Sequence, residues 1–85
     1  MSNFKVKLNH DKINNLLMDC IIRENLTDIG SLSEKIGYSR QWLYQLLAKA
    51  KQNKNVRVAS LKKLIDYFKT VYGEDFNWLE LLKQE

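Results

Sequence analysis

Residues 29–48 read IGSLSEKIGYSRQWLYQLLA, and this stretch decides the fold that we expect. It holds two short amphipathic segments on either side of Gly37, a residue suited to the left-handed backbone that ends a helix. Ser33 supplies a small residue where two such helices would cross. Aliphatic residues on both sides of the turn fill the space between the helices. The stretch therefore predicts two helices packed at a steep angle and joined by a tight turn.

The second of these helices is expected to run from Arg40 to about Lys51, with Ser39 as its amino-terminal cap. Its apolar residues recur on one helical face and are Leu43, Leu46, Leu47 and Ala50. The helix before the turn ends at Gly37, and three side chains are candidates to cap its start. The competing caps are Thr27, Asp28 and Ser31. Both helices thus carry their own start and stop signals.

Three further helices are expected around this unit. The first starts after Asn9 or Asp11 and ends near Asn25, with apolar residues recurring on one face. Another covers about 58–72 and stops at a glycine, and the last covers about 75–83. Helices therefore account for most of the chain.

Two segments fall outside these helices. Residues 52–57 read as a polar loop, and residues 1–9 read as an extended arm or a short strand because apolar residues alternate with lysines. A chain of 85 residues is long enough for one hydrophobic core. We therefore predict a single all-α domain over residues 1–85, with five helices, a short extended N-terminal arm and no sheet.

Composition narrows the class of protein. Hydrophobic residues make up 45% of the chain and charged residues 28%, which is a globular composition. The apolar runs are too short to cross a membrane, and the single cysteine, Cys20, excludes an internal disulfide and fits the reducing cytosol. One histidine, one cysteine and no glycine-rich phosphate loop offer neither a metal site nor a catalytic group. We therefore expect no cofactor and no enzyme activity.

The basic residues are concentrated in the middle of the chain. Between Glu34 and Asp66 there are eight basic residues and no acidic residue, whereas both ends carry a net negative charge. Such a cationic centre suits a polyanion, because neutralised phosphates release counterions. It is equally typical of a solvated basic surface. Charge alone therefore leaves both interpretations open.

A small residue, a turn glycine four positions later and two aliphatic residues carry a resemblance to a known family. These residues are Ser33, Gly37, Leu43 and Leu46. The chain resembles the lambda-repressor/Cro-type (XRE-like) helix-turn-helix regulators over about residues 11–82, and residues 59–68 are similar to the fourth helix of that family. Ile29 departs from it, because many members carry a phosphate-contacting glutamine there. The resemblance implies a repressor/Cro-like DNA-binding regulator in the cytoplasm of a prokaryote or of a phage-infected host.

The helix at about 40–51 is then expected to enter the major groove of double-stranded DNA. Its outward face carries glutamines that can pair with adenine, an arginine that can pair with guanine, and groups that can meet a thymine methyl. The expected base contacts are Arg40, Gln41, Tyr44, Gln45 and Ala48. The expected contacts with the DNA backbone are Ser39, Lys35, Lys49, Lys51, Lys54 and Arg57, and Gly37 forms the turn.

A protein-binding module with the same fold, such as a phage antirepressor or an inhibitor protein, is the alternative function. Tyr44 and Trp42 would suit a protein interface if exposed, although Trp42 lies beside the apolar face of its helix, where we expect it to pack. A DNA-binding protein of this size is expected to form a homodimer. The candidate dimer surfaces are the C-terminal helix with Phe76, Trp78 and Leu81, or the arm with Phe4, Val6 and Leu8.

Overall fold

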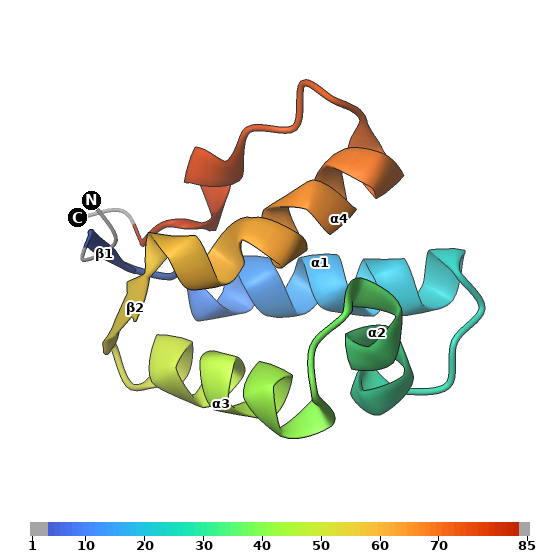
Figure 1. Ribbon diagram of the computed structural model, residues 1–85, viewed down its shortest axis with the longest axis horizontal. Helices are drawn as coiled ribbons and strands as arrows, with labels where there is room; N and C mark the ends of the chain where they lie inside the picture. The colour runs from blue at the N-terminus through green and yellow to red at the C-terminus, as the bar shows by residue number, and fades with distance from the viewer. Residues whose placement is uncertain (1–3, 84–85) are drawn as a thin grey trace.

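The computed structural model describes residues 4–83 (Figure 1). Four α-helices lie within this part of the chain: α1 (His10–Arg23), α2 (Ile29–Ile36), α3 (Arg40–Lys51) and α4 (Lys62–Tyr72). They are accompanied by two strands, β1 (Lys5–Lys7) and β2 (Asn55–Arg57). There are also two single turns of 3-10 helix, η1 (Val58–Leu61) and η2 (Trp78–Leu81). The chain is mostly helical, as predicted, but the predictions of five helices and of no sheet are wrong.

The first three helices each begin at a side-chain oxygen that accepts a hydrogen bond from the amide three residues later. The caps are Asn9, Asp28 and Ser39, with donor–acceptor distances of 3.1, 2.9 and 3.1 Å. Such caps satisfy amides that have no partner inside the helix. The structure confirms Ser39 as the cap of α3, and it selects Asn9 for α1 and Asp28 for α2 from the competing residues.

The turn between α2 and α3 is built around Gly37. Its φ of +106° lies in the left-handed region, as predicted. The amides of Gly37 and Tyr38 both donate to the carbonyl oxygen of Ser33, each at 2.9 Å, so the turn combines the 6→1 bond of a Schellman motif with the 5→1 bond of an αL cap. Ser33 is fully buried, and its hydroxyl donates to the Ile29 carbonyl oxygen at 2.9 Å. The small residue thus fits between the helices without an unsatisfied polar group.

The apolar faces of the four helices meet in one core. Helix α1 contacts α2, α3 and η2, and in Figure 1 it runs behind α4 while α3 forms the lower edge. The buried residues of α3 are Leu43, Leu46 and Ala50. Leu47, predicted on the same face, is partly buried. The core therefore holds α3 by its inner face and leaves its outer side uncovered.

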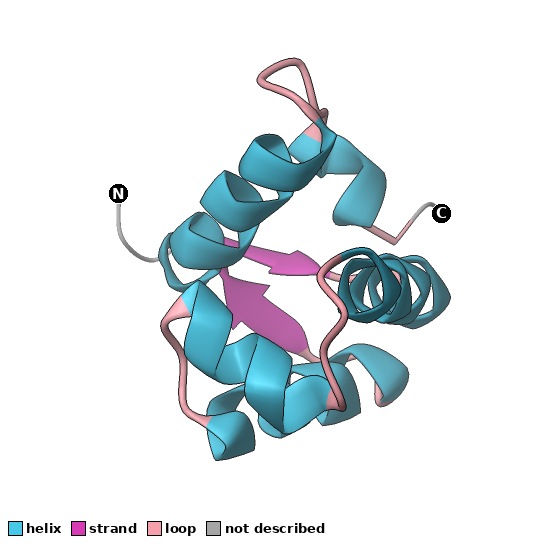
Figure 2. Cartoon of the chain, turned by 90° about the vertical axis from the view of Figure 1, so that its right-hand side faces the viewer, coloured by secondary structure: helices cyan, strands magenta, loops and turns pink. Residues whose placement is uncertain are grey.

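A small antiparallel sheet replaces part of the predicted loop at 52–57. Strands β1 and β2 pair with Lys5 opposite Arg57, Val6 opposite Val56 and Lys7 opposite Asn55. The two strands appear in magenta behind the helices in Figure 2. Val56 is buried, whereas its neighbours on β2 are exposed. One apolar residue between polar ones is too short a pattern to indicate a strand, and the partner segment supplies the rest of the stabilisation.

The other edge of β1 is also occupied. Leu8 forms a bridge with Leu82, and the Lys83 amide donates to the Lys7 carbonyl oxygen at 2.9 Å. The Asn9 amide donates to the Leu81 carbonyl oxygen at 2.8 Å. The predicted arm is therefore a strand that pairs within its own chain on both sides. Strand pairing between two copies through this arm, one of the predicted dimer contacts, would compete with these bonds.

The predicted helix over 75–83 is the single turn η2. Asn77 starts it by accepting a hydrogen bond from the Leu79 amide at 3.1 Å. Leu81 is fully buried and Leu79 is 53% exposed, so Leu81 lies in the core and not on the outer surface that the dimer prediction required. The residues after η2 are held extended by β1, and a short isolated helix has little stability of its own to oppose this. The prediction of a fifth α-helix is therefore wrong.

Because residues 75–83 contain a single turn and not the predicted α-helix, the predicted dimer surface also differs from the observed one. Leu81 belongs to the core of its own chain and is not available to a second copy. Phe76 packs inward, with its ring centroid 5.4 Å from that of Phe68. Trp78 is partly exposed and lies next to the exposed Leu79. Of the three predicted residues, Leu81 is buried, whereas Phe76 and Trp78 are both partly buried, and Trp78 is the one that lies within η2 beside Leu79.

Replacing Gly37 by valine is expected to lower the free energy of unfolding by about 1–3 kcal/mol, because a β-branched residue is strained in a left-handed backbone. A Cβ atom there would meet Lys63 Cδ at 3.7 Å, an ordinary contact, so the cost is conformational and not steric. Gly37→Asn is the matched control, since asparagine tolerates this backbone and should lose less stability. Urea unfolding measures both variants, and equal losses would contradict this account of the turn.

Candidate nucleic-acid interface

The outer side of α3 carries all the residues predicted to contact bases. Each of them is exposed, and Tyr44 has 49% of its surface accessible. Gln41, Gln45 and Ala48 follow one another at helical spacing and share a side with that tyrosine. The face therefore presents amide groups, a phenol and a methyl group together, without an acidic side chain among them.

Arg40 crosses the junction between α2 and α3. Its guanidinium lies over the backbone of Gly30, where a Cβ atom would overlap it. The Ser31 amide holds the pKa of Asp28 below its usual range, and the charge of Arg40 adds to this effect. The head group of Arg40 is therefore held beside the start of α2, at the edge of the face that α3 presents.

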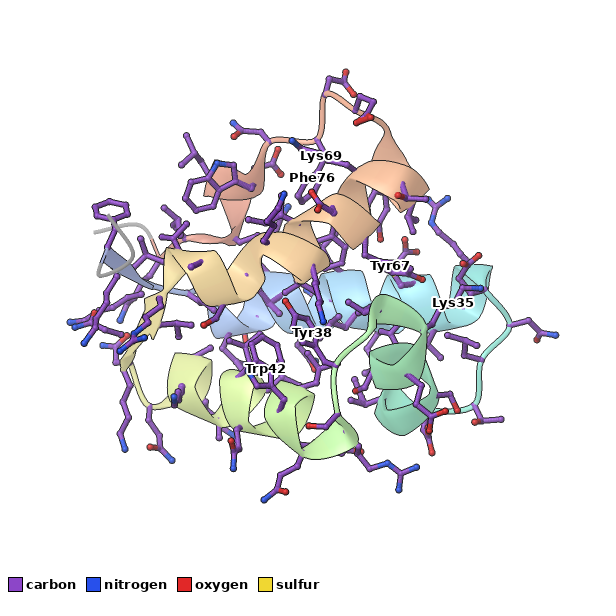
Figure 3. All side chains as sticks on the ribbon, viewed as in Figure 1. Lys35, Tyr38, Trp42, Tyr67, Lys69 and Phe76 are labelled. Atoms are coloured by element: carbon purple, nitrogen blue, oxygen red, sulfur yellow. The ribbon has the colours of Figure 1, made fainter. Side chains whose placement is uncertain are left out.

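Trp42 packs within the domain, as the sequence predicted. Its ring stacks on that of Tyr38, with centroids 3.8 Å apart and planes 16° from parallel (Figure 3). The Tyr38 hydroxyl donates to the Ser60 carbonyl oxygen at 2.7 Å and accepts from the Leu64 amide at 3.2 Å. Burial raises the pKa of Tyr38 above its ordinary value. This tyrosine joins the turn to the start of α4, a role that the sequence did not reveal.

Lys63 closes the turn from the side of α4. Its ammonium donates to the Gly37 carbonyl oxygen at 3.1 Å and lies 5.6 Å from the centroid of the Tyr38 ring. The hydrogen bond satisfies a carbonyl near the end of α2, where helix carbonyls lack intrahelical partners. The core therefore holds α3 by its inner face, and α4 holds the turn at the amino end of α3.

The residues predicted to contact the DNA backbone fall into two groups. Lys49, Lys51, Lys54 and Arg57 are exposed on α3 or just after it, and Ser39 is exposed at its start. Lys35 is separate, because its ammonium pairs with Glu24 of α1 at 3.0 Å. Figure 3 places Lys35 on the side of α2 toward α1, away from the lower edge formed by α3. Five of the six residues are therefore exposed on α3 or close to one of its ends, and Lys35 is the exception.

A shallow groove of about 330 Å³ lies beside this surface, between α3 and β2. We call it the α3–β2 groove. Gln45 and Lys49 line it from α3, and Lys5, Asn55 and Arg57 line it from the two strands. Sequence reasoning missed Lys5, because only the pairing of β1 with β2 brings the N-terminal segment to this place.

Acidic side chains compensate cations elsewhere in the domain. Within residues 4–83, ion pairs join acidic residues to His10, Lys12, Arg23, Lys35 and Lys62. No ion pair in this part of the chain involves a cation of α3 or β2. The positive charge of the central segment is therefore left uncompensated on the side where α3 and the groove lie.

Comparison with known proteins identifies no relative, since no model of a known protein family, no curated protein and no solved structure matches this chain. The described residues include no group of three or more histidine, cysteine, aspartate or glutamate side chains that could hold a metal ion. None of the helices in the described range combines the length and the apolar character needed to cross a membrane.

Removing the hydroxyl of Tyr38 is expected to destabilise the domain. Tyr38→Phe keeps the ring stack but leaves two backbone groups without their partner, which costs about 1–3 kcal/mol in the free energy of unfolding. Tyr44→Phe is the matched control, and its effect should stay within about 0.5 kcal/mol because that hydroxyl belongs to an exposed side chain. Chemical unfolding monitored by circular dichroism measures both. If the two variants unfold alike, the hydroxyl does not anchor the turn.

Proposed function

We propose that this protein is a sequence-specific, double-stranded-DNA-binding transcriptional regulator of the helix-turn-helix class, similar to the repressor/Cro-type proteins. In this proposal α3 enters the major groove, with α2 bracing it across the turn. The observation that carries it is the exposed row of uncharged hydrogen-bonding side chains on α3, flanked by uncompensated cations. The proposal places the regulator in the cytoplasm of a prokaryote or of a phage-infected cell.

The side chains of α3 suit the edges of base pairs in the major groove. Gln41 and Gln45 can each donate to N7 and accept from N6 of an adenine, and Arg40 can donate twice to a guanine. Ala48 and the ring of Tyr44 can pack on a thymine methyl group. Because the two glutamines lie on the solvated side of the helix, their amides satisfy no internal partner that would explain their presence.

The cations around α3 suit the phosphates on either side of that groove. Lys49 and Lys51 extend from the last turns of the helix, and Lys54 and Arg57 follow it. At the other end, Ser39 and the free amides of the first turn can meet a phosphate, which is favoured at a helix amino end. Lys35 is left out of this proposal because its ammonium already pairs with Glu24 at the end of α1.

Gln41→Ala and Gln45→Ala are each expected to weaken binding to the preferred duplex by about 1–3 kcal/mol. That duplex is first selected from a random pool with the parent protein, and affinities are then measured by fluorescence anisotropy. Binding to an unrelated duplex should change little, since phosphate contacts supply it. Gln52→Ala, which removes an exposed glutamine side chain just after α3, is the matched control and should bind like the parent.

Two results would contradict the proposal. Selection that enriches no sequence would exclude specific readout, and parental affinity in both glutamine variants would exclude this face of α3. Salt dependence separates the alternative function, because DNA affinity falls steeply with salt. A protein partner that bound the Tyr44 face with little dependence on salt would favour the protein-binding module instead.

A second copy of the chain is part of the proposal. One recognition helix reaches only a few base pairs, so two copies would place their α3 helices in successive major grooves, about 34–36 Å apart. The contact between copies is assigned to η2, where Trp78 is partly exposed and Leu79 is 53% exposed. Two adjacent apolar side chains at the surface suit a contact between identical faces.

Sedimentation of the parent with a palindromic duplex is expected to show two protein chains on each duplex. Trp78→Lys should reduce this to one chain, because a charge would be buried in the contact. Ile22→Lys is the control, since Ile22 is a 77% exposed apolar residue on α1 and outside the proposed contact. Circular dichroism confirms that both variants are folded. One parental chain on each duplex would rule out the dimer.

A further inference from the structure

The β1–β2 pair places two positive charges directly opposite each other. Lys5 faces Arg57 in the antiparallel register, and both side chains are exposed. Directly opposed residues have Cβ atoms about 4.5–5.5 Å apart, and like charges at that separation destabilise the pair. The next outward pair, Lys7 and Asn55, has only one charge. The repulsion is therefore confined to the Lys5–Arg57 pair, and both of these residues line the α3–β2 groove.

The same groove receives a third cation from a different element. Lys49 of α3 lines it together with Lys5 and Arg57, and Gln45 and Ser60 add neutral hydrogen-bonding groups. No acidic side chain is among its lining residues in the described part of the chain. Three cations from α3, β1 and β2 thus share one concave site without a carboxylate to balance them. A bound anion would supply that balance.

We propose that the α3–β2 groove binds a phosphate of the DNA backbone, with Lys5, Lys49 and Arg57 as its cationic ligands. This inference rests on the proposed function, and it makes the N-terminal strand part of the DNA interface. Gln45 belongs both to the outer face of α3 and to the groove, so the two surfaces are continuous. The phosphate held in the groove is therefore one that flanks the bases read by α3.

The geometry links phosphate binding to the stability of the sheet. Without an anion, the repulsion between Lys5 and Arg57 opposes the pairing of β1 with β2. With a phosphate between them, each cation gains a charge-assisted hydrogen bond and the repulsion is offset. Binding therefore stabilises the folded chain, because a ligand of the native state shifts unfolding by mass action.

The test compares Lys5→Gln with Lys7→Gln. Both variants remove one positive charge from the exposed face of β1, but Lys7 lies opposite Asn55 and does not line the groove. The first readout is the melting temperature in inorganic phosphate and in sodium chloride of equal ionic strength. Phosphate should raise the melting temperature of the parent and of Lys7→Gln, and the rise should be lost in Lys5→Gln. Equal responses in the two variants would overturn the groove as a phosphate site.

The second readout uses the selected duplex. Lys5→Gln should reduce the slope of log affinity against log salt concentration by about 1, the value for one lost phosphate contact, and leave the ranking of sequences unchanged. Lys7→Gln should keep the parental slope. If phosphate stabilises the parent through Lys5 but no duplex is bound, the groove takes free phosphate and the DNA assignment is overturned. If duplex binding is specific but the two variants have the same slope, only the proposal for the groove fails.

Discussion

The side chain of Tyr38 connects the turn between α2 and α3 to η1 and α4. Its ring stacks on Trp42 at the start of α3, and its hydroxyl bonds the backbone of Ser60 in η1 and of Leu64 in α4. Because η1 follows β2 directly, this link ties the turn before α3 to the segment that leads out of the sheet. One partly buried phenol therefore helps the core to hold α3 beside the segment that follows β2. Tyr38, in the turn between α2 and α3, thus helps to position the residues that would contact DNA.

The elements that the sequence predicts correctly are those whose signals lie within a few residues. Ser39 caps α3 through an amide three positions later, and Gly37 ends α2 through bonds to Ser33. The outer face of α3 follows from the same local logic, since the spacing of Leu43 and Leu46 fixes which side is buried. Trp42 lies beside that apolar face and packs as expected. Local hydrogen bonds and helical periodicity are sufficient for these features.

The features that the sequence does not predict depend on partners far along the chain. Strand β2 has one apolar residue, Val56, and becomes a strand only because β1 pairs with it. Residues 81–83 are held extended by the same strand, which leaves only one turn where a helix was expected. Lys35 has a cationic side chain like the other basic residues of the central segment, yet the end of α1 brings Glu24 to it. Lys5 reaches the groove because β1 pairs with β2. Pairing of this kind leaves no periodic pattern in a segment of three residues.

The position of β1 between β2 and residues 81–83 has a consequence for the order in which the domain assembles. Its hydrogen bonds join the two ends of the chain, and the loop-closure entropy of such contacts makes them form late and slowly. The α2–turn–α3 unit contains mainly local contacts and can form first. The β1–β2 pair contributes only Val56 and the partly buried Val6 to the core, and segments with few buried apolar contacts are the first to open in the folded protein. The recognition helix and the groove beside it are thus expected to differ in lifetime: the helix persists while the strand that completes the groove opens and closes.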